Sequence, residues 1–163
     1  SLSSTAPTMP TNYDYKRLIG WFKRVGGTIV AFHTYETEGG GIEMNWDVPT
    51  LDINLSNTLT TSRRTDAVKV PLNFSVIAHL NAVAADATTS QQTQVCCPDE
   101  TDAAPSNSAA PLCNLASNNG LAGMTVQLKI RTSSAGLIAA RSTLATVDFY
   151  FVSTIGFTWA RKN

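Results

Sequence analysis

Charge and long apolar runs are both scarce in this chain of 163 residues. Charged residues make up 15% of it, whereas an ordinary soluble domain contains about 25%. The 12 basic and 12 acidic residues balance to a net charge of zero, which gives no overall attraction to nucleic acid or anionic lipid. No apolar run approaches the ~18 residues of a membrane span. We therefore expect no membrane partner, and a surface that is largely covered by neighbouring subunits.

Cysteine is rare, and its three copies, Cys96, Cys97 and Cys113, occur in one region. An odd number of cysteines does not suit a disulfide framework, so we expect a reducing compartment. A zinc site needs four ligands, and two adjacent cysteines in a strand point apart. We therefore predict no metal at these cysteines.

Histidine is also rare, and this limits the classes of enzyme to which the chain could belong. Gly27 and His33 have the spacing that opens the cupin metal motif, but Tyr35 stands in place of its second histidine. The side chains that could complete a metal triad are Glu36, Glu38 and His79. Strand histidines that are hydrogen-bonded near the core explain His33 and His79 better. We therefore predict no catalytic, cofactor-binding or metal-binding residue, and a protein that is not an enzyme.

The sequence pattern predicts a single domain over 1–163 that begins with an extended arm over 1–11. A capping residue at Thr11 or Asn12, an apolar stripe and a Gly26-Gly27 stop predict a short helix that ends at Val25. We expect Trp21 and Phe22 to be mostly buried, because two bulky aromatic residues would otherwise leave an exposed apolar patch.

Beyond the helix, the apolar periodicity is that of β-strands. Alternation is clearest over Val68–Leu80, where we predict one long strand with Pro71 at a bulge or an edge. Residues 84–119 lose this periodicity and contain several acidic residues but no lysine or arginine, so we predict a long surface loop. The other expected strands are Thr28–Tyr35, which we expect to be covered on both faces, Ile42–Trp46, Leu51–Leu55, Met124–Arg131 and Val147–Trp159.

Basic doublets and tryptophans are the remaining candidates for binding. The doublets could contact phosphates, but solvated element ends and ordinary salt bridges explain them better. They are Lys16-Arg17, Lys23-Arg24, Arg63-Arg64 and Arg161-Lys162. Trp46 and Trp159 could stack on sugar rings, although their apolar strand neighbours favour packing in the core.

The segment Leu18–Ile29, which reads LIGWFKRVGGTI, resembles the helix and the start of strand D in picorna-like virus coat proteins. Those proteins typically read Trp-x-Gly-Ser/Thr-Ile/Leu at that point. The low charge and this spacing are most similar to plant comovirus-like (secovirus) coat proteins. In the same comparison the later segments resemble strands E to I, in the order 42–49, 51–56, 67–79, 124–131 and 146–159.

This resemblance implies an all-β protein, an antiparallel jelly-roll β-sandwich with one short helix near the N-terminus. It also implies a structural capsid protein of a small icosahedral positive-strand RNA virus, located in the virion and assembled in the host cytoplasm. Its partners would be other coat subunits, genomic RNA through weak or indirect contact, and a host receptor or vector. The alternative is a β-sandwich carbohydrate-binding or adhesion module, and a cupin-type enzyme comes third.

The resemblance also makes a prediction about missing strands. Only about 20 residues precede Gly20, too few for strands B and C before the helix. We expect those strands to come from an upstream segment or a neighbouring subunit. The segments Val68–Leu80 and Val147–Trp159 would then expose long apolar edges, and the chain alone would aggregate.

Overall fold

The computed structural model describes residue 11 and residues 21–106, 113–118 and 124–160. This part of the chain is all-β and contains no helix. Its strands are β1 (Arg24–Val25), β2 (Thr28–Ile29), β3 (Phe32–Glu36), β4 (Ile42–Leu59), β5 (Arg64–Ala67), β6 (Ile77–Ala85), β7 (Gln91–Cys96), β8 (Leu115–Ser117), β9 (Val126–Arg131), β10 (Leu137–Ser142) and β11 (Val147–Trp159). The described residues accordingly include no helix that could cross a membrane.

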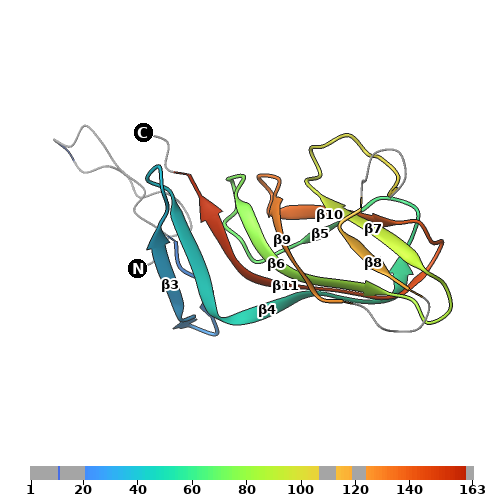
Figure 1. The fold of residues 1–163 in the computed structure, drawn as a ribbon. Coiled ribbons are helices and arrows are strands. Elements are labelled where there is room, and N and C mark those ends of the chain that lie inside the picture. Colours follow the sequence, from blue (N-terminus) through green and yellow to red (C-terminus); the bar gives the residue numbers. More distant parts are fainter. Residues whose placement is uncertain (1–10, 12–20, 107–112, 119–123, 161–163) are drawn as a thin grey trace.

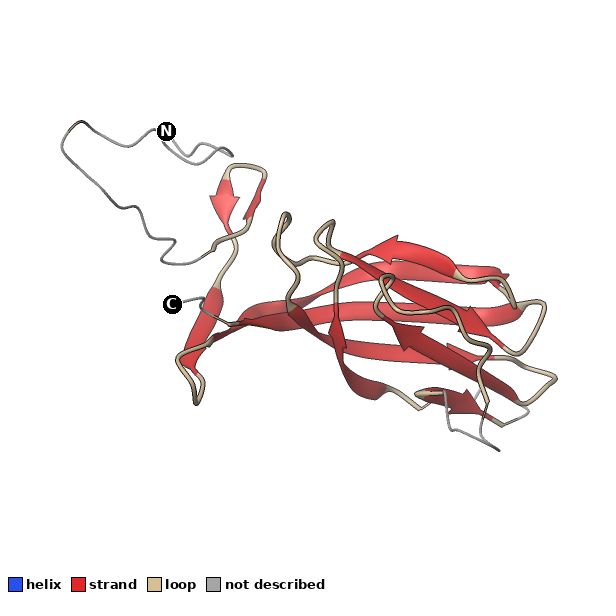
Figure 2. Ribbon diagram, turned by 90° about the horizontal axis from the view of Figure 1, so that it is seen from above, coloured by secondary structure: helices blue, strands red, loops and turns tan. Residues whose placement is uncertain are grey.

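The strands form two antiparallel sheets that pack against each other as a sandwich (Figure 1). The larger sheet has the order β3-β4-β11-β6-β9, and the smaller has the order β5-β10-β7-β8. A separate hairpin of β1 and β2 projects from the end of the sandwich where β3 lies (Figure 2).

The main core lies between the two sheets. Val95 of β7 and Ile138 of β10 come from the smaller sheet, and Leu80, Tyr150 and Val152 come from the larger one. A second cluster fills the end near β3 and consists of Met44, Trp46, Val76 and Phe157. Buried apolar side chains from both sheets thus hold the layers together, because burying apolar surface is the main force that favours folding.

The eight strands from β4 to β11 pair in a nested order. The first pairs with the last (β4 with β11), the second with the seventh (β5 with β10), the third with the sixth (β6 with β9) and the fourth with the fifth (β7 with β8). Because β11 lies between β4 and β6, both of its edges are paired. The predicted exposed edge at Val147–Trp159 is therefore wrong, and the expected supply of strands from an upstream segment or a neighbouring subunit stays a prediction.

Two of the predicted strands are confirmed, at β9 and β11. Two others, Ile42–Trp46 and Leu51–Leu55, are one continuous strand, β4. Opposite β11 the ladder passes from Asn45 to Thr50, so Pro49 lies in a bulge where its missing N–H costs no ladder hydrogen bond.

The long strand predicted over Val68–Leu80 is wrong for most of its length, because only its last four residues belong to β6. Residues 68–76 form a loop instead. Within it, Pro71 has no N–H to donate, and Asn73 has a φ of 67°, which is not a strand conformation. Val68 and Val76 are buried at the two ends of this loop, whereas Leu72 is 60% exposed. The alternation of apolar and polar residues over 68–76 therefore does not mark a strand.

The predicted N-terminal helix is not present in the residues that the structure describes. Residues 12–20 and most of the arm over 1–11 lie outside them, and 21–25 are not helical. Gly26 and Gly27 both have positive φ, at 56° and 88°, and they form the tight turn of the β1–β2 hairpin rather than a helix stop. Phe22 is 46% exposed, so the expected burial of this residue is wrong.

Two further expectations are corrected along the chain. The strand expected over Thr28–Tyr35 is divided between β2 and β3, and β3 is an exposed edge strand rather than one covered on both faces. The long loop predicted over 84–119 contains the end of β6 and the strands β7 and β8, with β7 paired on both sides. Residues 107–112 of that segment lie outside the described part.

Candidate functional site

A polar row crosses the outer face of the larger sheet. The strand registers place Asn45 of β4, Gly156 of β11, His79 of β6 and Lys129 of β9 side by side, and His33 of β3 pairs with Asn45. Directly paired residues of adjacent strands project from the same face. Alternation along β6 puts Ala78 and Leu80 in the core, so His79 projects outward. Both histidines thus belong to one row that sequence spacing alone could not reveal.

The row lies in an open groove of about 660 Å³. Gly156 shapes this groove, because a Cβ atom there would come within 2.5 Å of Asn45 Oδ1. The side chain of Asn45 therefore occupies the space beside Gly156. The groove is lined by Glu43, Asn45, His79, Leu80, Gln127, Leu128, Lys129 and Ile155.

His79 has a structural role in this groove. Its Nε2 lies 2.8 Å from Thr158 Oγ1, and its Nδ1 lies 3.9 Å from Glu43 Oε1, which also accepts a hydrogen bond from Asn45 Nδ2 at 2.9 Å. Burial lowers the pKa of His79, nearby Lys129 lowers it further, and the Glu43 carboxylate opposes both effects. The imidazole is therefore neutral at pH 7.

The structure does not bring together the side chains of the cupin alternative. His33 lies 3.6 Å from Asp47 in an exposed pair, while His79 faces Glu43. The described residues contain no cluster of three histidine, cysteine, aspartate or glutamate side chains that could hold a metal ion. The cupin triad therefore does not form in this part of the chain.

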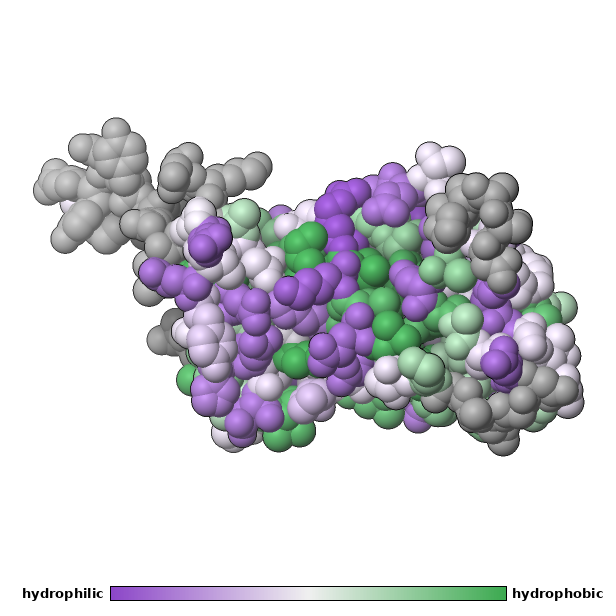
Figure 3. Space-filling model, in the orientation of Figure 1, coloured by the Kyte–Doolittle hydropathy of each residue, from purple (hydrophilic) through white to green (hydrophobic). Residues whose placement is uncertain are grey.

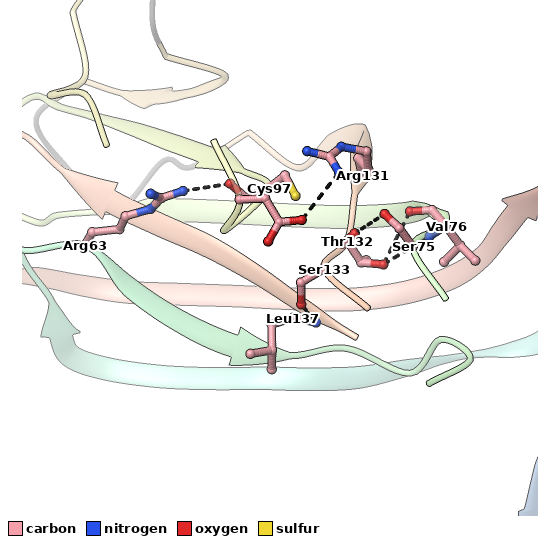
Figure 4. Close-up of polar contacts among 9 residues, drawn as sticks. Arg63, Ser75, Val76, Cys97, Arg131, Thr132, Ser133 and Leu137 are labelled. Carbon is pink, nitrogen blue, oxygen red and sulfur yellow. Dashed lines mark hydrogen bonds and ion pairs between the residues drawn. The ribbon is translucent and has the colours of Figure 1, made fainter. Parts of the chain in front are cut away.

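The three cysteines line one pocket of about 320 Å³ beside β7. Arg63 holds the chain there (Figure 4), because it donates to the carbonyl oxygens of Cys97 and Glu100 at 2.7 Å each. Burial raises the pKa values of Cys96 and Cys97, so both are neutral thiols at pH 7 and weak nucleophiles. The sequence analysis missed the anchoring role of Arg63, which no motif marks.

The two candidate sugar platforms are packed side chains. Trp46 is buried, with its ring centroid 6.1 Å from that of Phe157. Trp159 makes an edge contact with Trp21 at 6.0 Å. Trp159 also packs against the second cluster, so both indoles take part in the apolar packing at the β3 end of the sandwich.

The basic doublets that the structure describes bind within the chain. Arg64 makes a forked ion pair with Asp66 at 2.6 and 2.7 Å. Lys23 Nζ donates to Thr50 Oγ1 at 3.0 Å, and Arg24 donates to the carbonyl oxygen of Gly27 at 2.9 Å. Lys16-Arg17 and Arg161-Lys162 lie outside the described residues.

Apolar side chains reach the outer face of the larger sheet beside the polar row. Phe149 and Phe151 project from β11, opposite in direction to the buried Tyr150, and their ring centroids are 5.7 Å apart. Leu51 and Ile77 on the flanking strands are 54% and 37% exposed. Hydrophobic side chains also reach the surface at mid-molecule in the view of Figure 3. A broad face that mixes apolar and charged groups suits contact with another protein better than it suits catalysis.

Comparisons of the chain with protein-family models, with curated proteins and with solved structures find no match.

Proposed function

We propose that this chain is a structural capsid protein of a small icosahedral positive-strand RNA virus. As a jelly-roll subunit, it assembles in the host cytoplasm with sister coat proteins and encloses the genome in the virion. Its role is mechanical: a stiff sandwich supplies the wall, its faces and edges bury against neighbouring subunits, and its loops tolerate variation. It performs no catalysis.

The nested strand pairing is the observation that carries this proposal. A jelly roll results when a long antiparallel hairpin, with strand 1 paired to 8, 2 to 7, 3 to 6 and 4 to 5, wraps into two sheets. The sheets then have the orders 1-8-3-6 and 2-7-4-5. Counting β4 as strand 1 gives β4-β11-β6-β9 and β5-β10-β7-β8, in agreement with both observed orders. Strand β3 adds one edge strand beside β4.

In this numbering, the strand topology supports the proposal, whereas most of the sequence motifs do not occupy the positions that the resemblance gave them. The segment 42–59 takes the first position, where strand B lies, rather than the position of strand E. The motif Gly27–Ile29 belongs to the β1–β2 hairpin. Only the last strand, β11, keeps the position that the resemblance gave it, that of strand I.

Capsid, lectin and cupin domains share the jelly-roll architecture, so the surface must distinguish among them. A cupin enzyme needs a ligand cluster, and none forms among the described residues. A sugar-binding module needs a platform, and Trp46 and Trp159 are packed. A capsid subunit needs low charge and exposed apolar side chains for its neighbours. The chain has both, including Val25 at 60% and Ile29 at 54% exposure in the projecting hairpin.

The charge distribution supports weak or indirect contact with genomic RNA. The net charge is zero, and Arg63, Arg64 and Lys23 already contact groups of their own chain. These three side chains are therefore already engaged in the described part of the chain, and phosphate contacts dominate the affinity of proteins for nucleic acid. A host receptor or vector remains a prediction from the resemblance.

Sedimentation of the protein from its natural source tests the proposal. We expect it to co-sediment with other coat polypeptides in closed particles that protect RNA from nuclease, with electron microscopy showing icosahedral outlines. Recovery of the protein as a free monomer, with no RNA and with affinity for a glycan, would contradict the proposal and favour the carbohydrate-binding alternative.

A further inference from the structure

The outer face of the larger sheet carries opposite charges on its two flanks. We define this face by the outward residues of β4, β11, β6 and β9. The β4 flank carries Glu43, whereas the β9 flank carries Lys129 and Arg131. Between them lie the apolar side chains of Phe151 on β11 and Val83 on β6, which pair directly and are both half-buried.

We propose that this face binds the same face of a second copy of the chain. The two copies are related by a two-fold axis that runs parallel to the strands, midway between β11 and β6. Such an axis exchanges β4 with β9, and β11 with β6. A two-fold contact of this kind uses one self-complementary patch on both subunits. The proposal rests on the proposed function, because it names one contact among the coat subunits.

The strand registers place opposite charges at the same level of this contact. Glu43 pairs with Thr158, Thr158 pairs with Ile77, and Ile77 pairs with Arg131, so these four residues form one row across the sheet. The axis reverses each row of the second copy. Glu43 of one copy then faces Arg131 of the other, and by symmetry the pair occurs twice. Complementary potentials of this kind fix the orientation of two partners.

The same two-fold rotation brings apolar side chains of the two copies together in the middle of the face. Phe151 faces Val83 of the second copy, so apolar side chains that are half-buried in one copy cover each other. In the polar row, Asn45 faces Lys129 of the second copy, and Gly156, which has no side chain, faces His79 of the second copy. Aligned sheets pack about 10 Å apart with interleaved side chains, and the proposed contact has this arrangement.

The charges favour a second copy over other occupants. A ligand of a single charge sign would match one flank of the face and oppose the other. A neutral glycan would cover apolar side chains and supply no counter-charge to Lys129. Arg131 Nη1 has the Asp99 carboxylate of its own chain at 3.4 Å, and this exposed pair leaves the guanidinium accessible to a second carboxylate. Only a partner with the reversed charge pattern satisfies both flanks, and the face itself has that pattern when it is rotated.

A charge-swap series on the full chain tests this inference. Sedimentation equilibrium over a concentration series gives the dimer dissociation constant of the wild type, of Glu43→Arg, of Arg131→Glu and of the double variant. Lys69→Glu is the matched control, because Lys69 is exposed in a loop away from this face and its backbone N–H, which the substitution keeps, donates to Asp52 and Thr154. Circular dichroism confirms that each variant is folded.

We expect a wild-type dimer, and each single reversal should weaken it by at least about tenfold, because like charges then face each other. The double variant should recover most of the affinity, and the control should keep it. A wild type that stays monomeric at every concentration would overturn this inference, yet it would leave the proposed function standing if the natural protein is found in particles. A dimer that is unaffected by the reversals, or one that the double variant does not recover, would also overturn it.

Discussion

Gly156 and Asn45 are paired across β11 and β4 so closely that a side chain at position 156 has no room. A Cβ atom there would lie 2.8 Å from Asn45 Cα and would collide with the carbonyl oxygen of Met44. These neighbours are backbone atoms of a central strand pair, so they cannot move aside as a flexible side chain could. The glycine is therefore a requirement of the ladder at its register shift.

The substitution Gly156→Ala should therefore destabilise the fold. Overpacking against backbone typically costs about 1–3 kcal/mol, and we expect a loss of that size in the free energy of unfolding, measured by chemical denaturation. Ser153→Ala, at a half-buried position of the same strand, is the control and should lose less. Equal stability of the Gly156→Ala variant and the wild type would show that the two strands separate easily at this point.

Asn114 acts as a substitute strand partner for β7. Its Nδ2 donates to the Val95 carbonyl oxygen at 2.7 Å, and its Oδ1 accepts from the Val95 N–H at 2.8 Å. The substitution Asn114→Ala should cost about 1–3 kcal/mol, because both backbone groups of Val95, a buried core residue, lose their partner. Hydrogen exchange at the Val95 amide should accelerate more than exchange across β10. An unchanged Val95 exchange rate would contradict this role.

His79 should make the stability of the fold depend on pH. Its pKa is lowered in the folded chain, so the unfolded chain binds more protons below the ordinary pKa of histidine, near 6.5. The stability that comes from the neutral imidazole is complete at pH 7.5 and is lost as the pH falls below that value. We expect denaturation midpoints to decline between pH 7 and 5, and His79→Gln to reduce this decline. An equally steep profile in the variant would assign the effect to other groups.

Arg63 should protect the segment that follows β7 from proteases. Its guanidinium joins the strand region before β5 to the carbonyl oxygens of Cys97 and Glu100. The substitution Arg63→Ala should make residues 97–106 more sensitive to limited proteolysis without unfolding the sandwich, since local opening needs less free energy than global unfolding. Arg63→Lys should rescue only in part, because a single ammonium group does not reproduce the fork of a guanidinium. Proteolysis that begins elsewhere would contradict this prediction.

The strands that the sequence predicted correctly are those whose buried face is apolar. In β11, Val147, Tyr150 and Val152 are buried in the core, and its aromatic and β-branched composition is typical of a strand. The sequence analysis missed β7 because its buried face is partly polar. Gln91 and Thr93 point into the protein, where Gln91 Nε2 donates to the Ala84 carbonyl oxygen at 2.8 Å and Thr93 Oγ1 donates to Gln91 Oε1 at 2.6 Å. Hydrophobic periodicity cannot identify polar side chains that are buried and paired.

The candidate site was beyond sequence reasoning for a different reason. His33, Asn45, His79 and Lys129 come from four strands, and only the strand registers bring them into one row. The predicted helix end at Val25 is wrong, because Gly26 and Gly27 suit both a helix stop and a hairpin turn and here form the turn. Residues 12–20 of the predicted helix lie outside the described residues. When a local sequence pattern fits two structures, its tertiary surroundings determine which of the two forms.

The nested strand pairing has a consequence for synthesis on the ribosome. Strand β4 is made before the other seven strands of the sandwich, yet its main partner, β11, is the last to emerge. The central ladder can therefore form only after residue 159 has left the exit tunnel, and closing such long loops makes folding slow. During that delay the nascent β4 has unpaired hydrogen-bonding groups and exposed apolar side chains, which makes aggregation a hazard of translation.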